Sequence, residues 1–275
     1  MLSHFSVAAM LAALVGHREL IWGFAARDVL ERHKGALLGV GWNVLQPLLQ
    51  LAIYTAVFGY IFGSRWERGT LPAPIDFPVT LFAGLVVFNV FAESVGRAPT
   101  AVSSRPNLVR RVVFPVEILP VTVVVSALVH MAIGAALLLL IVLGFTGSVS
   151  PTAWAFPVVV APLVMLSLGA AWLLGALGVF VRDVRQIVVV LTQLLMFTTP
   201  LFFSIDRVPE EYPMIRWAVG HNPLSIIVEN ARRTLVWGEW PQWGAVGVMT
   251  LLGAVVMVGG WAFFSACRRG MADVH

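Results

Sequence analysis

Six apolar runs, each long enough to cross a lipid bilayer, constrain the fold of this chain more than any other feature. A membrane-spanning helix needs ~20 mostly apolar residues. Because 59% of the residues are hydrophobic and only 12% are charged, the chain carries more apolar surface than a soluble protein of this length can bury. We therefore predict an all-α, polytopic membrane protein with six transmembrane helices. The runs cover about residues 36–63, 79–99, 113–145, 153–181, 186–205 and 243–267.

The predicted domain organisation is simple. We expect one domain over residues 1–275, in which a six-span bundle occupies 36–267. Residues 1–16 are apolar but lack the basic start of a signal peptide. We interpret them as a short interfacial or packed helix, with a retained signal-like segment as the alternative.

Residues 17–34 have the pattern of a helix that lies along a membrane surface. Two pairs at i,i+4, Arg27 with Glu31 and Asp28 with Arg32, are expected to support it. A plain helix in the cytosol is the alternative. The expected apolar side holds Trp22, Ala25, Ala26 and Val29, and the expected charged side holds Arg27, Glu31 and Lys34.

Basic residues are divided unevenly between the two sets of loops, and this division predicts the orientation. If the N-terminus is cytosolic, twelve basic residues fall inside and six outside, as the positive-inside rule requires. Both termini are then cytosolic. The inner set is Arg18, Arg27, Arg32, Lys34, Arg97, Arg105, Arg110, Arg111, Arg182, Arg185, Arg268 and Arg269, and the outer set is Arg65, Arg68, Arg207, Arg216, Arg232 and Arg233.

The first span carries a polar stripe. Four polar residues fall within a ~80° arc of one helix face, and Asn89 and Glu93 form a shorter polar face on the second span. Polar side chains in a span face protein or water rather than lipid. The stripe therefore predicts either hydrogen bonds between helices or the lining of a path for a hydroxyl-rich cargo. Its members are Asn43, Gln46, Gln50 and Tyr54.

The third span begins in an unusual way, with the sequence LVRRVVFPVEILP from Leu108 to Pro120. Pro115 suits a first helical turn, whereas Pro120 lies deeper and is expected to kink or restart the helix. Glu117 is favourable near a helix N-terminus. The segment is either an ordinary positively charged anchor at the cytosolic membrane surface or a rigid cytosolic element that contacts a partner protein.

Residues 204–242 form the longest stretch between spans. Asn222 is a good helix cap and Pro223 fits the first helical position. Several tryptophans surround this start, as is typical of a membrane interface. We predict short outer helices that dip into the membrane, return and close the outer end of a conduit. A surface hairpin with an aromatic belt is the alternative.

Motifs for chemistry are missing from the sequence. It contains no Gly-rich phosphate-binding loop, no HExxH and no GxSxG, and Cys267 is the only cysteine. His130 is the only histidine deep in a span and is expected to be a hydrogen-bonded core residue. We therefore predict no catalytic site, no metal site and no ATPase activity in this chain.

Several motifs, taken in order, resemble one family of membrane proteins. The chain is similar to the membrane subunit of bacterial ABC exporters for lipid-linked polysaccharides, the O-antigen and teichoic-acid export permeases. The resemblance covers nearly the whole chain. Its segments are RELIWGFAARDVLERHKGALLGVGWNVLQPLL, PNLVRRVVFPVEILP, GVFVRDVRQIV, TTPLFFS and NPLSIIVENARRTLVWG.

The resemblance implies partners and roles that the residues alone do not. Two copies of the chain would form the conduit, two separate ATPase subunits would bind from the cytosol through a coupling loop at 97–111, and ATP and Mg would bind only to those subunits. The implied coupling residues are Arg97, Arg105, Arg110, Arg111, Glu117, Arg182 and Arg185. Residues implied in admitting the lipid headgroup are Arg27, Arg32 and Lys34. The implied outer gate comprises Pro200, Phe202, Phe203, Trp217, Asn222 and Pro223, and the implied conduit lining is Asn43, Gln46, Gln50, Tyr54 and Asn89.

Three functions remain open at this point. The first is export of polysaccharide on a polyprenyl pyrophosphate carrier, whose anion interface arginines can hold. The second is an ABC exporter of a capsular polysaccharide, teichoic acid, another lipid or a drug. The third is a membrane enzyme, which would need clustered acid–base or metal-binding residues that the sequence does not show.

Overall fold

The computed structural model describes residues 7–32, 34–61, 63, 71, 73–109, 114–205 and 209–274. Within these residues the fold is all-α, as predicted, and contains no strand. The helices are α1 (Val7–Gly16), α2 (Arg18–Glu31), α3 (Trp42–Tyr54), α4 (Ala73–Ala101), α5 (Pro106–Val109), α6 (Ile118–Thr146), α7 (Phe156–Phe180), α8 (Val184–Thr198), α9 (Pro213–His221), α10 (Pro223–Leu235) and α11 (Trp243–Val274). Short 3₁₀ turns cover Gly39–Gly41 and Pro151–Ala155, and a π-helix covers Thr55–Ile61.

Five helical segments in the described residues are long and apolar enough to cross a membrane. They are Gly39–Ile61, Ile75–Ala101, Ile118–Thr146, Pro151–Phe180 and Trp243–Arg268, and they correspond to five of the six predicted spans. The chain is thus a multi-pass membrane protein. The remaining predicted span, 186–205, is helical only in α8, which has 15 residues. This apolar helix lies within the predicted run, but it ends before residue 205 because the chain leaves the helix at Thr199, which is extended, as residues before proline usually are.

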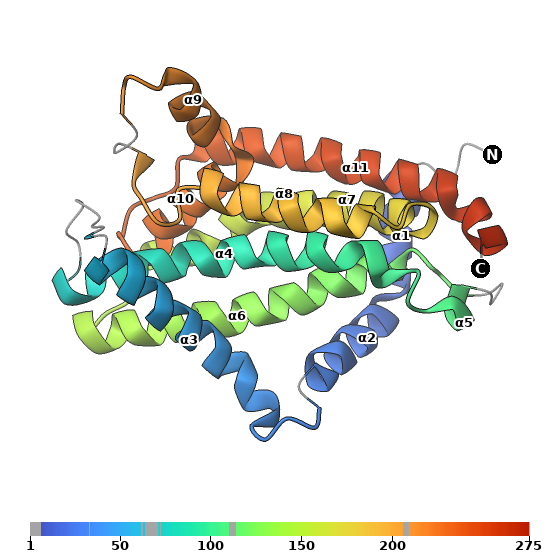
Figure 1. Ribbon diagram of the computed structural model, residues 1–275, viewed down its shortest axis with the longest axis horizontal. Coiled ribbons are helices and arrows are strands. Elements are labelled where there is room, and N and C mark those ends of the chain that lie inside the picture. Colours follow the sequence, from blue (N-terminus) through green and yellow to red (C-terminus); the bar gives the residue numbers. More distant parts are fainter. Residues whose placement is uncertain are drawn as a thin grey trace.

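The long helices lie side by side, with α4 near the centre of the bundle (Figure 1). α4 packs against α6 and α7 and also touches α8 and α10. Helices α1 and α5 and the C-terminal part of α11 lie at one end of the bundle, and α9 and α10 lie at the other (Figure 1). We refer to these as the α5 end and the α10 end.

Helices α7 and α11 share the most extensive contact in the described part of the chain, and glycines between them let their backbones approach closely. A Cβ atom added at Gly260 would lie 2.1 Å from the carbonyl oxygen of Gly169, and one at Gly169 would lie 2.3 Å from that of Val256. Small residues let membrane helices approach in this way. Trp172 and Trp261 pack edge to face beside this contact, with ring centroids 5.2 Å apart.

The N-terminal segment forms two helices with a sharp bend. α1 and α2 meet at 62°, and Met10 of α1 is buried in the core. The position of α2 at the membrane surface stays a prediction. The packed face of α2 consists of Ile21, Ala25 and Val29. Trp22 was predicted on that face, but its side chain is 61% exposed, which places it on the outward side of the helix.

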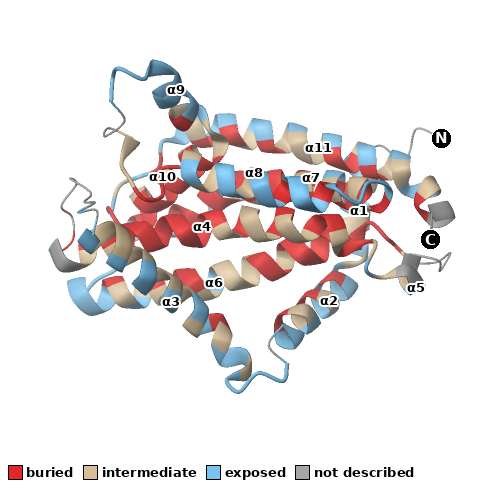
Figure 2. Ribbon diagram, viewed as in Figure 1, coloured by how far each residue is buried: buried red, intermediate tan, exposed pale blue. Residues whose placement is uncertain are grey.

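Helix α3 diverges from the bundle, and its residues are mostly intermediate or exposed (Figure 2). It starts at Trp42, later than the predicted start at residue 36, because Gly35 and Gly39 have positive φ values of 87° and 48° that break the helix. Only Asn43 is buried in α3. At Tyr54 the helix passes into the π-helix, in which no residue is buried.

The start of the third span differs from its prediction at Pro120. α6 begins at Ile118, so Pro120 lies in the first turn, where its missing N–H would have no helical partner in any case. The helix therefore neither kinks nor restarts at this proline. Pro115 was expected in the first helical turn but precedes the helix, and both prolines are buried.

The segment between the last two spans contains the predicted short helices. The Asn222 side chain caps α10 by accepting a hydrogen bond from the N–H of Leu224 at 3.0 Å, and Pro223 is the first helical residue. Both features were expected from the sequence. Helix α10 is mostly buried against α4, α7 and α11, whereas α9 is mostly exposed.

Candidate functional site

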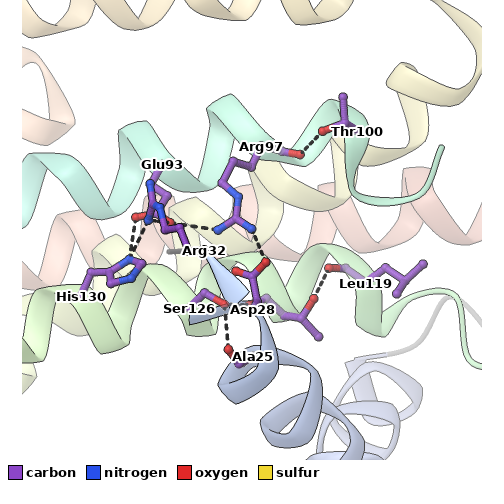
Figure 3. Close-up of polar contacts among 10 residues, drawn as sticks. Ala25, Asp28, Arg32, Glu93, Arg97, Thr100, Leu119, Ser126 and His130 are labelled. Carbon is purple, nitrogen blue, oxygen red and sulfur yellow. Dashed lines mark hydrogen bonds and ion pairs between the residues drawn. The ribbon is translucent and has the colours of Figure 1, made fainter. Parts of the chain in front are cut away.

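Five charged or titratable side chains meet where α2 approaches α4 and α6 (Figure 3). Glu93 and Arg97 lie one turn apart on α4, and Arg97 Nη1 lies 3.0 Å from Glu93 Oε1. The other terminal nitrogen of Arg97 donates a hydrogen bond to Asp28 on α2. These contacts fasten α2 to α4.

Glu93 is the centre of this network. Its Oε1 accepts a hydrogen bond from Arg32 Nη1 at 2.8 Å, and its Oε2 lies 2.9 Å from His130 Nδ1 on α6. The Glu93 side chain is only 14% exposed, and a carboxylate removed from water requires partners of this kind. His130 is thus a hydrogen-bonded residue of the interior, as predicted, and the network joins α2, α4 and α6.

The pairing within α2 differs from the prediction. Asp28 and Arg32 bind Arg97 and Glu93 instead of each other, since carboxylates and guanidinium groups interact more strongly where less water separates them. Burial would raise the pKa of Asp28, but the hydrogen bond and the charge of Arg97 outweigh this effect and keep that pKa below its ordinary value. Arg27 and Glu31 do pair, at 3.9 Å, but both side chains are exposed, and an exposed ion pair contributes little.

A cavity of about 250 Å³ lies between α3, α4 and α6, and the network forms part of its wall. Apolar side chains, among them Phe82, Leu85 and Met131, provide the rest of the wall. The cavity therefore combines amides and charges with an apolar surface. Its polar lining consists of Arg32, Asn43, Gln46, Gln50, Asn89, Glu93 and His130.

Two polar atoms of this lining are buried without a hydrogen-bond partner in the described part of the chain. They are Nδ2 of Asn43 and Nε2 of His130. Buried polar groups are usually satisfied, and an unsatisfied one costs about 1–3 kcal/mol. The cavity is therefore suited to a guest that offers hydroxyl or anionic oxygen atoms.

The predicted conduit lining divides into two groups. Asn43, Gln46, Gln50 and Asn89 all border the cavity. Tyr54 instead belongs to an aromatic cluster nearer the α10 end, where its ring centroid lies 5.2 Å from that of Phe202. The stripe is thus one face of α3 that continues from an amide-lined cavity to an aromatic contact.

Phe202 is the centre of the aromatic cluster among the predicted gate residues. It stacks on Phe58 of the π-helix with centroids 4.2 Å apart and planes at 17°, and Phe197 lies 6.2 Å away. Phe203 is half-buried next to it and Pro200 is buried. Trp217 lies apart from the cluster on α9, 65% exposed, and stacks on His221.

The residues implied in ATPase coupling are placed in several environments near the α5 end. Arg97 belongs to the network, Arg105 lies 5.3 Å above the ring of Phe24 on α2, and the buried Glu117 pairs with Arg268 of α11 at 3.2 Å. Arg110 and Arg111 lie outside the described residues. Exposed Arg182 and Arg185 border a second cavity, of about 440 Å³, with Thr100 and Ser103.

The residues implied in admitting a headgroup also differ from one another. Arg27 and Lys34 are exposed, so their charges face the surroundings of α2. Arg32 points into the network and borders the first cavity, with 37% of its side chain exposed. Among these three, Arg32 is the side chain placed to contact both a surface ligand and the cavity.

Sequence reasoning missed Arg232, which it counted among the outer charges. Its side chain is fully buried. The signal was present, because Arg232 follows Val228 by four residues and precedes Leu235 by three, which places it on the apolar face of α10. Arg268 was likewise treated only as a cytosolic charge, since nothing local in the sequence identifies a partner as distant as Glu117.

Comparison with known proteins agrees with this architecture. The protein family described as ABC-2 type transporter matches residues 19–236. The O-antigen export system permease protein RfbA of Myxococcus xanthus is 32% identical over 205 residues, which cover 74% of this chain and 75% of that protein. Two proteins of the same name from Klebsiella pneumoniae are 24% and 23% identical over 250 residues, or 90% of this chain and 92% of each of theirs.

Proposed function

The chain belongs to the ABC-2 type transporter family, and from this membership we propose that it exports an O-antigen-like polysaccharide, carried on polyprenyl pyrophosphate, across the bacterial inner membrane. As a member of this family it is a transport subunit that works with a separate ATPase. Support for the cargo comes from relatives named as O-antigen export permeases, which match most of the chain.

The amide-lined cavity is the observation that carries this proposal. Sugar hydroxyls donate and accept hydrogen bonds, as do Asn43, Gln46 and Gln50. The cavity also borders Arg32, whose guanidinium can bind a phosphate oxygen in two-point fashion. A lining of this kind holds a lipid-linked sugar at its charged end while its hydroxyl groups find partners in the wall.

Orientation and stoichiometry belong to the same proposal. The α5 end faces the cytosol with both termini, which agrees with the excess of basic residues there. Two copies of the chain form the complete conduit, and two ATPase subunits bind at the α5 end. ATP and Mg bind to the ATPase subunits, and this chain binds neither.

Coupling to the ATPase is assigned to the segment around 97–111, with a smaller contact at Arg182 and Arg185. Glu117, which follows this segment at the start of α6, stabilises its position through the ion pair with Arg268 of α11. Arg97 and Arg105 already contact α2, so they transmit movement to the interfacial helix. We expect charge reversal at Arg110 and Arg111 to lower transport-coupled ATPase activity while membrane insertion persists, and normal coupling in that variant would remove their docking role.

The outer gate is assigned to the aromatic cluster at the α10 end. Phe202, with Pro200 and Phe203 beside it, closes the path against Phe58 and Tyr54 of the first span. Asn222 and Pro223 start the helix α10 that supports this region, and Trp217 on α9 anchors it at the membrane surface.

A complementation experiment tests the cargo. Cells that lack this subunit receive either the wild-type chain or Gln46→Leu/Gln50→Leu, and polysaccharide at the cell surface is quantified by staining. We expect wild type to restore it, the double variant to restore at most about a tenth, and Gln242→Leu, an exposed amide at the α10 end, to match wild type. If the wild-type chain left surface polysaccharide unchanged but altered resistance to a drug or the export of another lipid, a different ABC exporter cargo would replace this proposal.

A further inference from the structure

Arg232 makes three hydrogen bonds to backbone carbonyl groups of two other segments. Its Nε donates to Thr80 of α4 at 3.0 Å, Nη1 to Pro200 at 2.7 Å and Nη2 to Leu201 at 3.0 Å. The side chain is fully buried, and a buried cation is stable only with partners of good geometry. The contacts hold three segments, α4, α10 and the turn after α8, in one arrangement.

The turn after α8 supplies carbonyl groups that no helix uses. α8 ends at Thr198, and the last carbonyl groups of a helix and those beyond it lack helical partners. Arginine presents its donors in a planar fork, which lets one side chain satisfy two consecutive carbonyl groups of the turn. Arg232 therefore fixes the backbone of Pro200 and Leu201 from outside.

Gly84 of α4 makes room for this arrangement. A Cβ atom at Gly84 would lie 2.6 Å from Arg232 Nη2 and 3.1 Å from a methyl carbon of Leu201. The absence of a side chain thus allows the guanidinium group to lie against α4. This position offers a second way to disturb the contact without changing Arg232.

The fixed turn carries Phe202 directly after Leu201. Thr199, Leu201 and Phe202 are all buried, with 4% or less of each exposed, and Asn222 Nδ2 donates to Thr199 Oγ1 at 3.1 Å. Phe58, on the opposite side of the stack, belongs to the π-helix, in which no residue is buried. π-helices are rare and often mark functional positions. The one that carries Phe58 is less buried than the turn that carries Phe202.

We propose that Arg232 is a positioning residue for export, which holds Phe202 as the fixed side of the outer gate so that the gate opens by displacement of Phe58 with the π-helix. The inference rests on the proposed function in one respect, the position of the gate in the cargo path. It adds two assignments to the proposed function: Arg232 as the residue that sets the closed geometry, and the π-helix with Phe58 as the side of the gate that moves.

The positioning role is tested with a cross-link across the stack. In the assembled transporter, with Cys267→Ser as background, Phe58→Cys and Phe202→Cys are oxidised in membranes and the disulfide yield is measured. We expect a high yield with Arg232, a several-fold lower yield with Arg232→Gln or Gly84→Ala, and an intermediate yield with Arg232→Lys, which keeps the charge but loses the fork. Arg233→Gln serves as the matched control, because this neighbouring arginine of the same helix contacts Glu239 and the carbonyl oxygen of Trp240 instead of the turn.

Folding is followed separately by membrane yield and by gel filtration. A variant that keeps a normal elution profile but loses the cross-link supports positioning. An unchanged disulfide yield in Arg232→Gln and Gly84→Ala, or an equal loss in Arg233→Gln, would overturn it. If Arg232→Gln fails to accumulate, Gly84→Ala and Arg232→Lys provide the same comparison.

A second experiment tests which side of the gate moves. It uses two engineered disulfides, and each oxidised variant is compared with the same variant in its reduced state. Export is measured in cells before and after oxidation of the Phe58→Cys/Phe202→Cys pair and of a Thr199→Cys/Asn222→Cys pair. We expect the first disulfide to stop export reversibly and the second to leave it at the level of the reduced variant. Reversible arrest by the second disulfide would show that the turn moves, which refutes this inference and leaves the proposed function intact. If export were unchanged with the first disulfide formed, the gate would not lie on the path of the cargo.

Discussion

Arg268 Nη1 lies 3.2 Å from Glu117 Oε1, although the two residues are 151 positions apart in sequence. The same Glu117 accepts a hydrogen bond from the indole of Trp172 at its backbone oxygen, at 3.0 Å. The start of α6, which follows the proposed coupling segment, is therefore attached to α7 and to α11. These two helices also share the most extensive contact in the described part of the chain, so the start of α6 is attached to both members of one packed pair.

This attachment predicts a measurable coupling between the two residues. Glu117→Gln and Arg268→Gln should each lower the melting temperature of the purified protein in detergent, and the double variant should lose less than the sum. Because Arg268 is 46% exposed, we expect a coupling energy of only about 0.5–1 kcal/mol. Strictly additive losses would mean that the ion pair does not connect α6 to α11.

The contact between Asp28 and Arg97 predicts a larger effect. Asp28→Asn should destabilise the folded protein by about 1–2 kcal/mol, because it leaves a half-buried guanidinium group with one carboxylate fewer. Thermal unfolding in detergent measures this loss. Glu31→Gln is the control on the same helix, since its pair with Arg27 is exposed, and an equal effect of both substitutions would contradict the account.

The stability supplied by Asp28 should depend on pH in one direction. Its pKa is lowered in the folded protein, so its contribution is complete above its unfolded pKa of about 3.9 and is lost as the pH falls through the folded value. The difference in melting temperature between wild type and Asp28→Asn should be constant above about pH 5 and shrink in more acidic buffer. A difference that grows on acidification would have the wrong sign.

Glycines between α7 and α11 predict a contrast between adjacent positions. Gly260→Ala forces a methyl group onto the Gly169 carbonyl oxygen and should sharply lower the yield of folded protein, as overpacking does. Gly259→Ala has no neighbouring atom within 4 Å and should be neutral or slightly stabilising, since alanine favours a helix over glycine. Yield from membranes and melting temperature distinguish the two.

Much of the fold could be predicted because the governing patterns are local. Apolar runs of ~20 residues identify spans, and Asn222 followed by Pro223 identifies the start of α10 from two residues alone. The stripe from Asn43 to Gln50 was placed on one face by helical spacing, and that face borders a cavity.

The remaining features depend on contacts between distant segments. Asp28 prefers Arg97 over Arg32 only because α2 packs against α4 and α6, which no local rule specifies. The fifth predicted span ends early because Pro200 follows Thr199 and because Arg232 binds the carbonyl groups beyond it. The burial of Arg232 was readable from its position on the apolar face of α10, yet its three acceptors come from two other segments.

Reconstitution tests the central claim most directly. The chain and its ATPase subunit are placed together in lipid vesicles loaded with polyprenyl-pyrophosphate-linked polysaccharide, and the transfer of the polysaccharide across the bilayer is measured on adding ATP. The account predicts transfer that requires both subunits and hydrolysable ATP, and that falls by at least about tenfold with Gln46→Leu/Gln50→Leu. Transfer by this chain alone, or ATP hydrolysis by the assembled complex with no transfer of the polysaccharide, would contradict it.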